Sequence, residues 1–132
     1  MRMNLEAVIN TLIEETSAYL IILFGSAASR RMRKDSDVDI AFLSNKDLSN
    51  YEVFMIAQEL SSILNKDVDL IDLSKASTVL KANILGTGRV IYCVDDKKKH
   101  EFQIRTFKDY CLLNEERKVI LDKIRQRGSI YA

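Results

Sequence analysis

Proline is absent from this chain of 132 residues, and only two cysteines occur, Cys93 and Cys111. No internal repeat, low-complexity stretch or linker is present. The two cysteines lack the spacing of metal ligands, and we expect both to be reduced thiols in the core. Together with the length, these absences predict a single domain that spans residues 1–132.

An excess of one charge and long apolar runs are also missing. The chain has 20 Lys and Arg against 19 Asp and Glu, a formal net charge of +1. Proteins that coat nucleic acids carry a strong basic excess, so we expect no direct nucleic-acid partner. No apolar stretch approaches the roughly 20 residues that span a bilayer, and the N-terminus does not resemble a signal peptide. We therefore expect a cytoplasmic protein with no membrane partner.

The apolar pattern predicts an α/β (α+β) fold, in which helices alternate with strands around one polar loop. Helical spacing marks the first dozen residues, the segment after Asn50, a segment capped by Ser74 or Ser77 that ends at Gly86 and Gly88, and a long helix that Gly128 ends. Apolar runs predict strands. These strands cover residues 19–24, 37–43, 68–73 and 89–94.

Three aspartates occur at the start of a predicted strand or within one. Asp37 and Asp39 open the second predicted strand, and Asp69 lies within the third. Residues i and i+2 of a strand point to the same face, about 6.6 Å apart, and a neighbouring strand lies only ~4.8 Å away. We therefore expect the three carboxylates to form one cluster, which would repel itself unless cations neutralise it.

A glycine and a serine follow the first strand. Gly25 allows the backbone to approach a phosphate closely, and the Ser26 hydroxyl and nearby N–H groups can bond phosphate oxygens. Oxygen-only ligands favour Mg²⁺, whose remaining positions phosphate oxygens can fill. Two such ions can activate an attacking oxygen and stabilise a leaving pyrophosphate. The combination predicts a nucleotidyl-transfer site.

These motifs resemble the signature of the polymerase-β nucleotidyltransferase superfamily in its minimal form. The nearest resemblance is to the MntA type, the antitoxins of HEPN/MNT (type VII) toxin–antitoxin pairs. The similarity covers nearly the whole chain. The segments that carry it are LFGS at 23–26, ten further residues, DVD at 37–39 within DSDVDI at 35–40, VDLIDL at 68–73, GRVIY at 88–92 and RGSIY at 127–131.

The resemblance implies a small mixed sheet flanked by helices, with a long C-terminal helix. It implies that Asp37 and Asp39 bind two Mg²⁺ ions, that Asp69 binds the catalytic ion and helps to deprotonate the acceptor, and that Gly25 and Ser26 hold the triphosphate of ATP. It further implies transfer of AMP to a tyrosine of a partner HEPN ribonuclease, which silences that toxin.

Three assignments stay open on the residues alone. Asp67 points to the same face as Asp69 and is the alternative third ligand, although a carboxylate at the start of a strand is usually solvated. Ser36 either contacts phosphate or is only a turn residue. The cationic loop, Arg30, Arg31, Arg33 and Lys34, either steers ATP or an acidic partner, or is simply solvated.

Two other functions fit the same residues. One is nucleotidyl transfer to a small molecule such as an aminoglycoside, with a homodimer supplying the missing wall of the site. The other is a non-catalytic antitoxin that occludes its partner. Size favours the protein acceptor, because nucleotidyltransferases that act on transfer RNA or antibiotics usually carry extra helical domains. Retention of all five residues, Gly25, Ser26, Asp37, Asp39 and Asp69, argues against a vestigial site.

Overall fold

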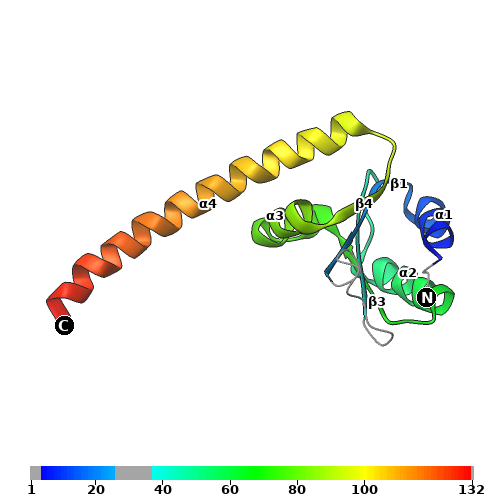
Figure 1. The fold of residues 1–132 in the computed structure, drawn as a ribbon, viewed down its shortest axis with the longest axis horizontal. Coiled ribbons are helices and arrows are strands. Elements are labelled where there is room, and N and C mark those ends of the chain that lie inside the picture. The colour runs from blue at the N-terminus through cyan, green and yellow to red at the C-terminus, as the bar shows by residue number, and fades with distance from the viewer. Residues whose placement is uncertain (1–3, 26–36, 132) are drawn as a thin grey trace.

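A four-stranded sheet forms the centre of the molecule (Figure 1). The computed structural model describes residues 4–25 and 37–131, with side chains as far as residue 126. The sheet order is β3-β2-β1-β4; β1 pairs antiparallel with β2 and β4, and β2 pairs parallel with β3. This mixed sheet confirms the predicted fold class. The strands are β1 (Ala18–Phe24), β2 (Val38–Ser44), β3 (Val68–Asp72) and β4 (Arg89–Cys93).

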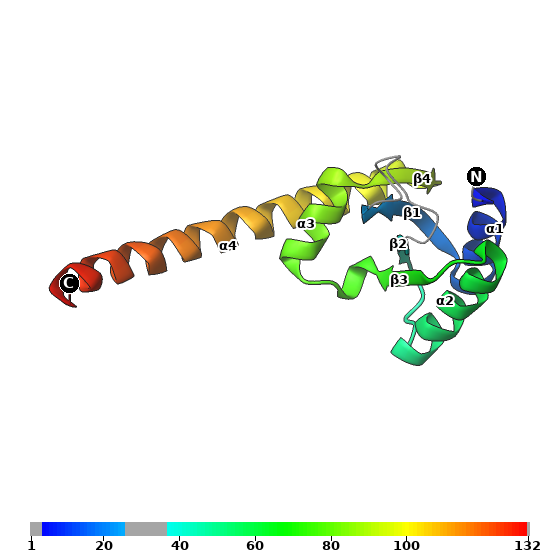
Figure 2. The ribbon, with the colours of Figure 1, turned by 60° about the horizontal axis from the view of Figure 1, so that its bottom comes forward.

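Helices cover both faces of the sheet (Figures 1 and 2). On one face, α1 (Leu5–Thr16) and α2 (Asn50–Leu64) pack over one core cluster. On the other face, α3 (Thr78–Thr87) and the start of α4 (Asp96–Tyr131) pack over a second cluster. A 3-10 turn, Leu73–Lys75, links β3 to α3, so the third strand ends one residue earlier than predicted.

The apolar run forms β1, one of the two inner strands, and it is buried from both sides. Ile21 and Leu23 contact the cluster under α1 and α2, whereas Leu20 and Ile22 contact the cluster under α3. A strand with helices on both faces needs apolar side chains at successive positions, which explains the run. In the order of the described elements β2 follows β1 directly, and residues 26–36 between them lie outside the description.

Serine side chains set where α2 and α3 begin. The Ser49 Oγ accepts the Glu52 N–H at 3.1 Å, so Asn50 is the first helical residue and its prediction as the cap was wrong. Ser49 has the extended backbone that an N-cap requires, with ψ at 160°. The Ser77 Oγ accepts the Leu80 N–H at 3.2 Å, which decides between the two predicted caps of α3.

The glycines predicted to end helices were right only in part: Gly88 closes α3 as predicted, whereas Gly86 and Gly128 end no helix. Gly86 lies inside α3, and the helix closes at Gly88, whose N–H donates to the Ile84 carbonyl at 2.7 Å. The last helix continues through Gly128 to Tyr131, because one glycine costs a helix only about 1 kcal/mol. None of the helices in residues 4–25 and 37–131 is both long and apolar enough to cross a bilayer.

Candidate active site

The register of the sheet places two of the predicted aspartates side by side. Asp39 of β2 is the direct partner of Asp69 in the parallel ladder with β3. Both alternate with residues of the α1 and α2 cluster, such as Ile40 and Leu70, so both side chains lie on the opposite face, which α3 covers. Asp37 immediately precedes β2, two positions from Asp39. The ladder therefore brings Asp39 and Asp69 together on one face, and Asp37 lies just outside it.

The electrostatics of Asp39 reflect these neighbours. Partial burial raises the pKa of the Asp39 carboxyl above its ordinary value, and the nearby charges of Asp69 and Asp37 raise it further. A carboxyl group with like charges beside it is costly to ionise unless a cation is present. The three aspartates thus form one electrostatic unit around Asp39.

Gly25 lies directly against the Asp39 carboxylate. Its φ is +65°, a conformation that side chains rarely adopt, and a Cβ built there would lie 2.3 Å from Asp39 Oδ2. The pairing of Phe24 with Asp39 across β1 and β2 brings the turn to this position. Only glycine gives a backbone this close to the carboxylate, which is the approach that a phosphate cradle beside a metal-binding group needs.

Asp67 occupies a different position from Asp69. Its carbonyl accepts the Val38 N–H at 2.9 Å, which aligns the start of β3 with the start of β2. Its side chain is exposed, as that of Asp69 is, but of the two only Asp69 pairs with Asp39 in the ladder and raises the pKa of Asp39. The geometry therefore favours Asp69 over Asp67 as the third carboxylate, although the assignment itself stays a prediction.

The donor set at this site fits a hard divalent cation. The candidate ligands are carboxylate oxygens, with no imidazole or thiol among them, and such ligands suit Mg²⁺. Within the described residues, no three potential ligand side chains are close enough as they stand to hold an ion. The fit therefore rests on the chemistry of the oxygens and on the proximity of Asp39 to Asp69.

A cleft of about 510 Å³ opens along the outer edge of β3. Asp69 lines it, together with Phe54 of α2 and Lys75 and Leu80 on the α3 side. Phe54 is 57% exposed, and it is not among the site residues predicted from the sequence. The one clue to Phe54 in the sequence was an aromatic residue directly after Val53, which belongs to the buried stripe of α2. Asp69 is therefore reachable from this edge of the sheet.

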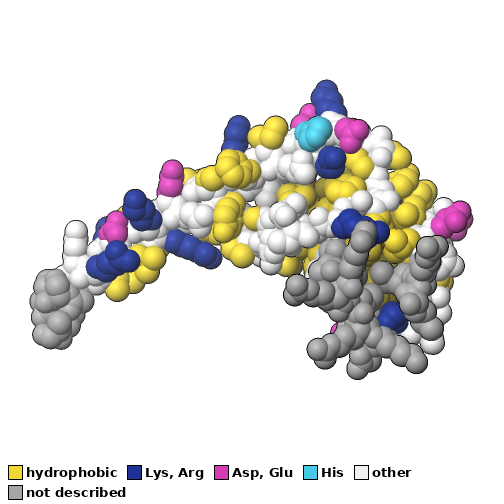
Figure 3. Space-filling model, in the orientation of Figure 1, with side chains coloured by type: hydrophobic (Ala, Val, Ile, Leu, Met, Phe, Trp, Pro, Cys, Tyr) yellow, Lys and Arg dark blue, Asp and Glu magenta, His cyan; other side chains and the backbone are white. Residues whose placement is uncertain are grey.

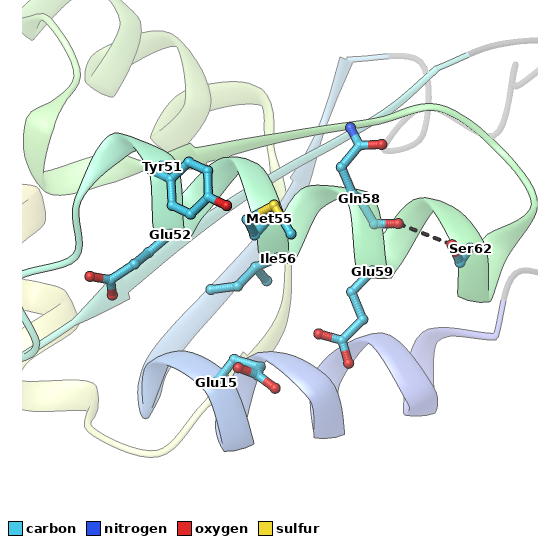
Figure 4. Close-up of a pocket in the computed structure, with 8 residues that line it drawn as sticks. All are labelled: Glu15, Tyr51, Glu52, Met55, Ile56, Gln58, Glu59 and Ser62. Carbon is cyan, nitrogen blue, oxygen red and sulfur yellow. Dashed lines mark hydrogen bonds between the residues drawn. The ribbon is translucent and has the colours of Figure 1, made fainter.

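A second hollow, of about 500 Å³, lies between α1 and α2 (Figure 4). Its lining includes Glu15 from α1 and Tyr51, Glu52 and Glu59 from α2. These helices cover the face of the sheet opposite to Asp39 and Asp69. This hollow is therefore separate from the candidate active site.

Several predicted site residues fall outside the described residues. They are Ser26, Ser36 and the basic loop positions Arg30, Arg31, Arg33 and Lys34. Their proposed contacts with phosphate or with a partner remain predictions from the sequence. Both cysteines are free thiols, as expected, but each is only partly buried, so the prediction that they lie in the core was wrong.

Comparison with known proteins identifies the family. The sequence model of the polymerase-β nucleotidyltransferase family matches residues 6–97, which contain all four strands and the aspartates. The chain belongs to this family. It is thus a nucleotidyltransferase in fold and in enzyme class, as the resemblance implied.

Individual relatives show which members of this family the chain is similar to. The chain is 37% identical to the protein adenylyltransferase MntA of Shewanella oneidensis over 105 residues, which are 80% of this chain and 75% of the relative. A crystal structure of a toxin–antitoxin with AMP-PNP matches 92% of this chain and 98% of its own, with a TM-score of 0.83 and 34% identity. A structure of tri-AMPylated Shewanella oneidensis HEPN toxin in complex with MNT antitoxin matches 90% of this chain and 93% of its own. That match has a TM-score of 0.75 and 33% identity.

Proposed function

We propose that this chain, acting as one domain of residues 1–132, is a protein adenylyltransferase antitoxin. It transfers AMP from ATP to a tyrosine hydroxyl of a partner HEPN ribonuclease toxin and so neutralises the toxin. The observation that carries the proposal is the match over 90% of the chain to an antitoxin solved with an AMPylated HEPN toxin. The pairing of Asp39 with Asp69 beside Gly25 supplies a site for that chemistry.

The transfer forms one bond to phosphorus, breaks another and releases one proton. The tyrosine oxygen attacks the α-phosphorus of ATP, and the bond from that phosphorus to the bridging oxygen of the β-phosphate breaks. The electron pair leaves with pyrophosphate, and the acceptor proton passes to the Asp69 carboxylate. Asp69 suits this role because it lines the cleft through which an acceptor enters and neighbours Asp39.

The remaining residues hold the triphosphate and the metal. Gly25, Ser26 and Ser36 would bond the phosphate oxygens, and Asp37, Asp39 and Asp69 would hold two Mg²⁺ ions. Bound Mg²⁺ supplies neutralisation of the phosphate charge and of the leaving pyrophosphate. The exposed edge of β3 keeps Asp69 accessible from the partner's side.

The test uses purified protein, ATP labelled on the α-phosphate and a HEPN ribonuclease toxin. Label should pass to the toxin only with Mg²⁺, and toxin ribonuclease activity should fall in parallel. The Asp39→Asn variant should transfer at least about 100-fold more slowly, since even outer-shell changes at metal sites cost 10–100-fold. Mass spectrometry of the toxin should place the added AMP on tyrosine.

Two outcomes would contradict the proposal. Label appearing on an aminoglycoside and not on the toxin would establish small-molecule transfer. Full protection of cells by Asp39→Asn, with an unmodified toxin, would establish inhibition by occlusion.

A further inference from the structure

The long helix α4 is an addition to the catalytic fold. The family match ends at residue 97, where α4 has just begun, so nearly all of this helix lies outside the shared nucleotidyltransferase core. The match to the toxin–antitoxin structure with AMP-PNP covers 92% of this chain and therefore includes most of α4. The helix belongs to the part of the chain shared with antitoxins that have been solved with their toxins.

Most of α4 extends beyond the body of the protein. Its 36 residues span about 54 Å at 1.5 Å per residue, whereas α3, with 10 residues, spans about 15 Å. Helix α3 can therefore cover only the first part of α4. Figures 1 and 2 show the remainder projecting away from the sheet.

The apolar stripe of α4 continues beyond the part of the helix that α3 covers. Near the body, Phe102 packs on the core cluster under α3, and Thr106 is buried. Helix neighbours three and four positions apart share a side, so the same side continues through Tyr110 and Leu113. It then reaches a group that we call the distal stripe, with each side chain more than half exposed. The distal stripe consists of Ile120, Leu121 and Ile124.

The distal stripe faces the same side of the molecule as the active site. Asp39 and Asp69 lie on the sheet face that α3 covers, and the distal stripe continues the side of α4 that contacts α3. In both ribbon views β1, which ends next to Gly25, points toward the side on which α3 and α4 lie. Figure 3 shows apolar side chains along α4 beside the hollow that separates its distal half from the body. A protein seated there would be held beside the site.

Charge disfavours a second copy of this chain as the occupant. Helix α4 has ten Lys and Arg against six Asp and Glu, which leaves ten basic and thirteen acidic residues in the rest of the chain. Two α4 helices packed along their distal halves would bring together surfaces of the same net positive charge. An apolar helix face with acidic groups beside it is the complementary surface.

We infer that the distal stripe is the docking surface for the acceptor protein, through an apolar face that acidic residues flank. This inference rests on the proposed function for the identity of that protein. Exposed contiguous apolar side chains on a protein surface are typical of interaction sites. Docking at α4 raises the effective concentration of the acceptor tyrosine at Asp69.

The experiment compares two double variants of α4. Ile120→Gln with Ile124→Gln makes the distal stripe polar, and Lys118→Gln with Asp122→Asn alters the opposite side of the helix. Both pairs leave the net charge unchanged, and glutamine supports helix formation well. Circular dichroism and binding of Mg²⁺ with AMP-PNP in the absence of toxin should match the wild-type protein for both.

The Kd for the purified HEPN toxin should rise at least tenfold for the stripe variant and stay within twofold for the control. Binding by the stripe variant at the wild-type Kd would overturn the inference. So would a wild-type dimer that the stripe variant dissociates without weakening toxin binding, because the occupant would then be a second copy. If the wild-type protein binds toxin through the stripe but transfers no AMP, the proposed function fails and the docking surface stands.

Discussion

Substitution of Gly25 by alanine should separate stability from catalysis. The residue has φ of +65°, and an added Cβ would lie 2.3 Å from Asp39 Oδ2, whereas ordinary contact begins at 3.4 Å. The left-handed backbone costs an alanine roughly 1–2 kcal/mol of folding free energy. The contact itself can be relieved, because its nearest atom is the end of a side chain. The carboxylate must move by about 1 Å, which at a catalytic group costs on the order of 100-fold in rate.

The matched control is Gly86→Ala in α3. A Cβ at Gly86 meets nothing within 4 Å, and alanine is favoured over glycine in a helix by about 0.5–1 kcal/mol. Urea denaturation should therefore give a lower midpoint for Gly25→Ala and an equal or higher one for Gly86→Ala. Labelled AMP transfer should fall about 100-fold only in Gly25→Ala. Wild-type transfer by Gly25→Ala would refute the reasoning, because Asp39 would then not need its observed position.

Three further predictions concern stability. Gly88→Ala should lower the free energy of unfolding in urea by about 1–3 kcal/mol, because its Cβ would lie 2.5 Å from both the Ile84 carbonyl oxygen and Ile22 Cγ2. An unchanged urea midpoint would contradict the close packing. Ser49→Ala should cost about 1 kcal/mol and Asn50→Ala much less, since only Ser49 caps α2; the reverse order in thermal unfolding would restore Asn50 as the cap. Asp39→Asn should raise the urea midpoint of the protein at pH 7 in EDTA, because burial and the charges of Asp69 and Asp37 raise the pKa of Asp39 and so make its ionised form destabilising; a lower midpoint would show that these charges lie farther apart.

The sequence predicted the strands well because apolar residues dominate each of them, although only β1 and β2 are buried along most of their length. The run before Gly25 could only be a central strand, and the i, i+2 spacing of Asp37 and Asp39 fixed their common side. Pairing of Asp39 with Asp69 could not be predicted as a certainty. It depends on the parallel ladder between β2 and β3, which the Asp67 carbonyl helps to align.

Helix ends were harder to predict, for local reasons. Ser49 and Asn50 are both good caps, and only the extended backbone at Ser49 distinguishes them. The apolar spacing of α4 suggested a long helix. The exposure of Ile120 and Ile124 follows instead from the shortness of α3, which does not reach them. Phe54 was missed because an apolar residue beside a buried stripe looks like part of the core.

The central claim is that Asp69 joins Asp37 and Asp39 in one metal-binding, catalytic group. Its most direct test is single-turnover AMP transfer to the HEPN toxin at increasing Mg²⁺, measured in parallel for Asp69→Asn and Asp67→Asn. We expect Asp69→Asn to lose at least about 100-fold in the maximal rate, beyond the 10–100-fold typical of outer-shell changes, and Asp67→Asn to behave as the wild-type protein. Full activity in Asp69→Asn, with the loss falling on Asp67→Asn instead, would contradict the account.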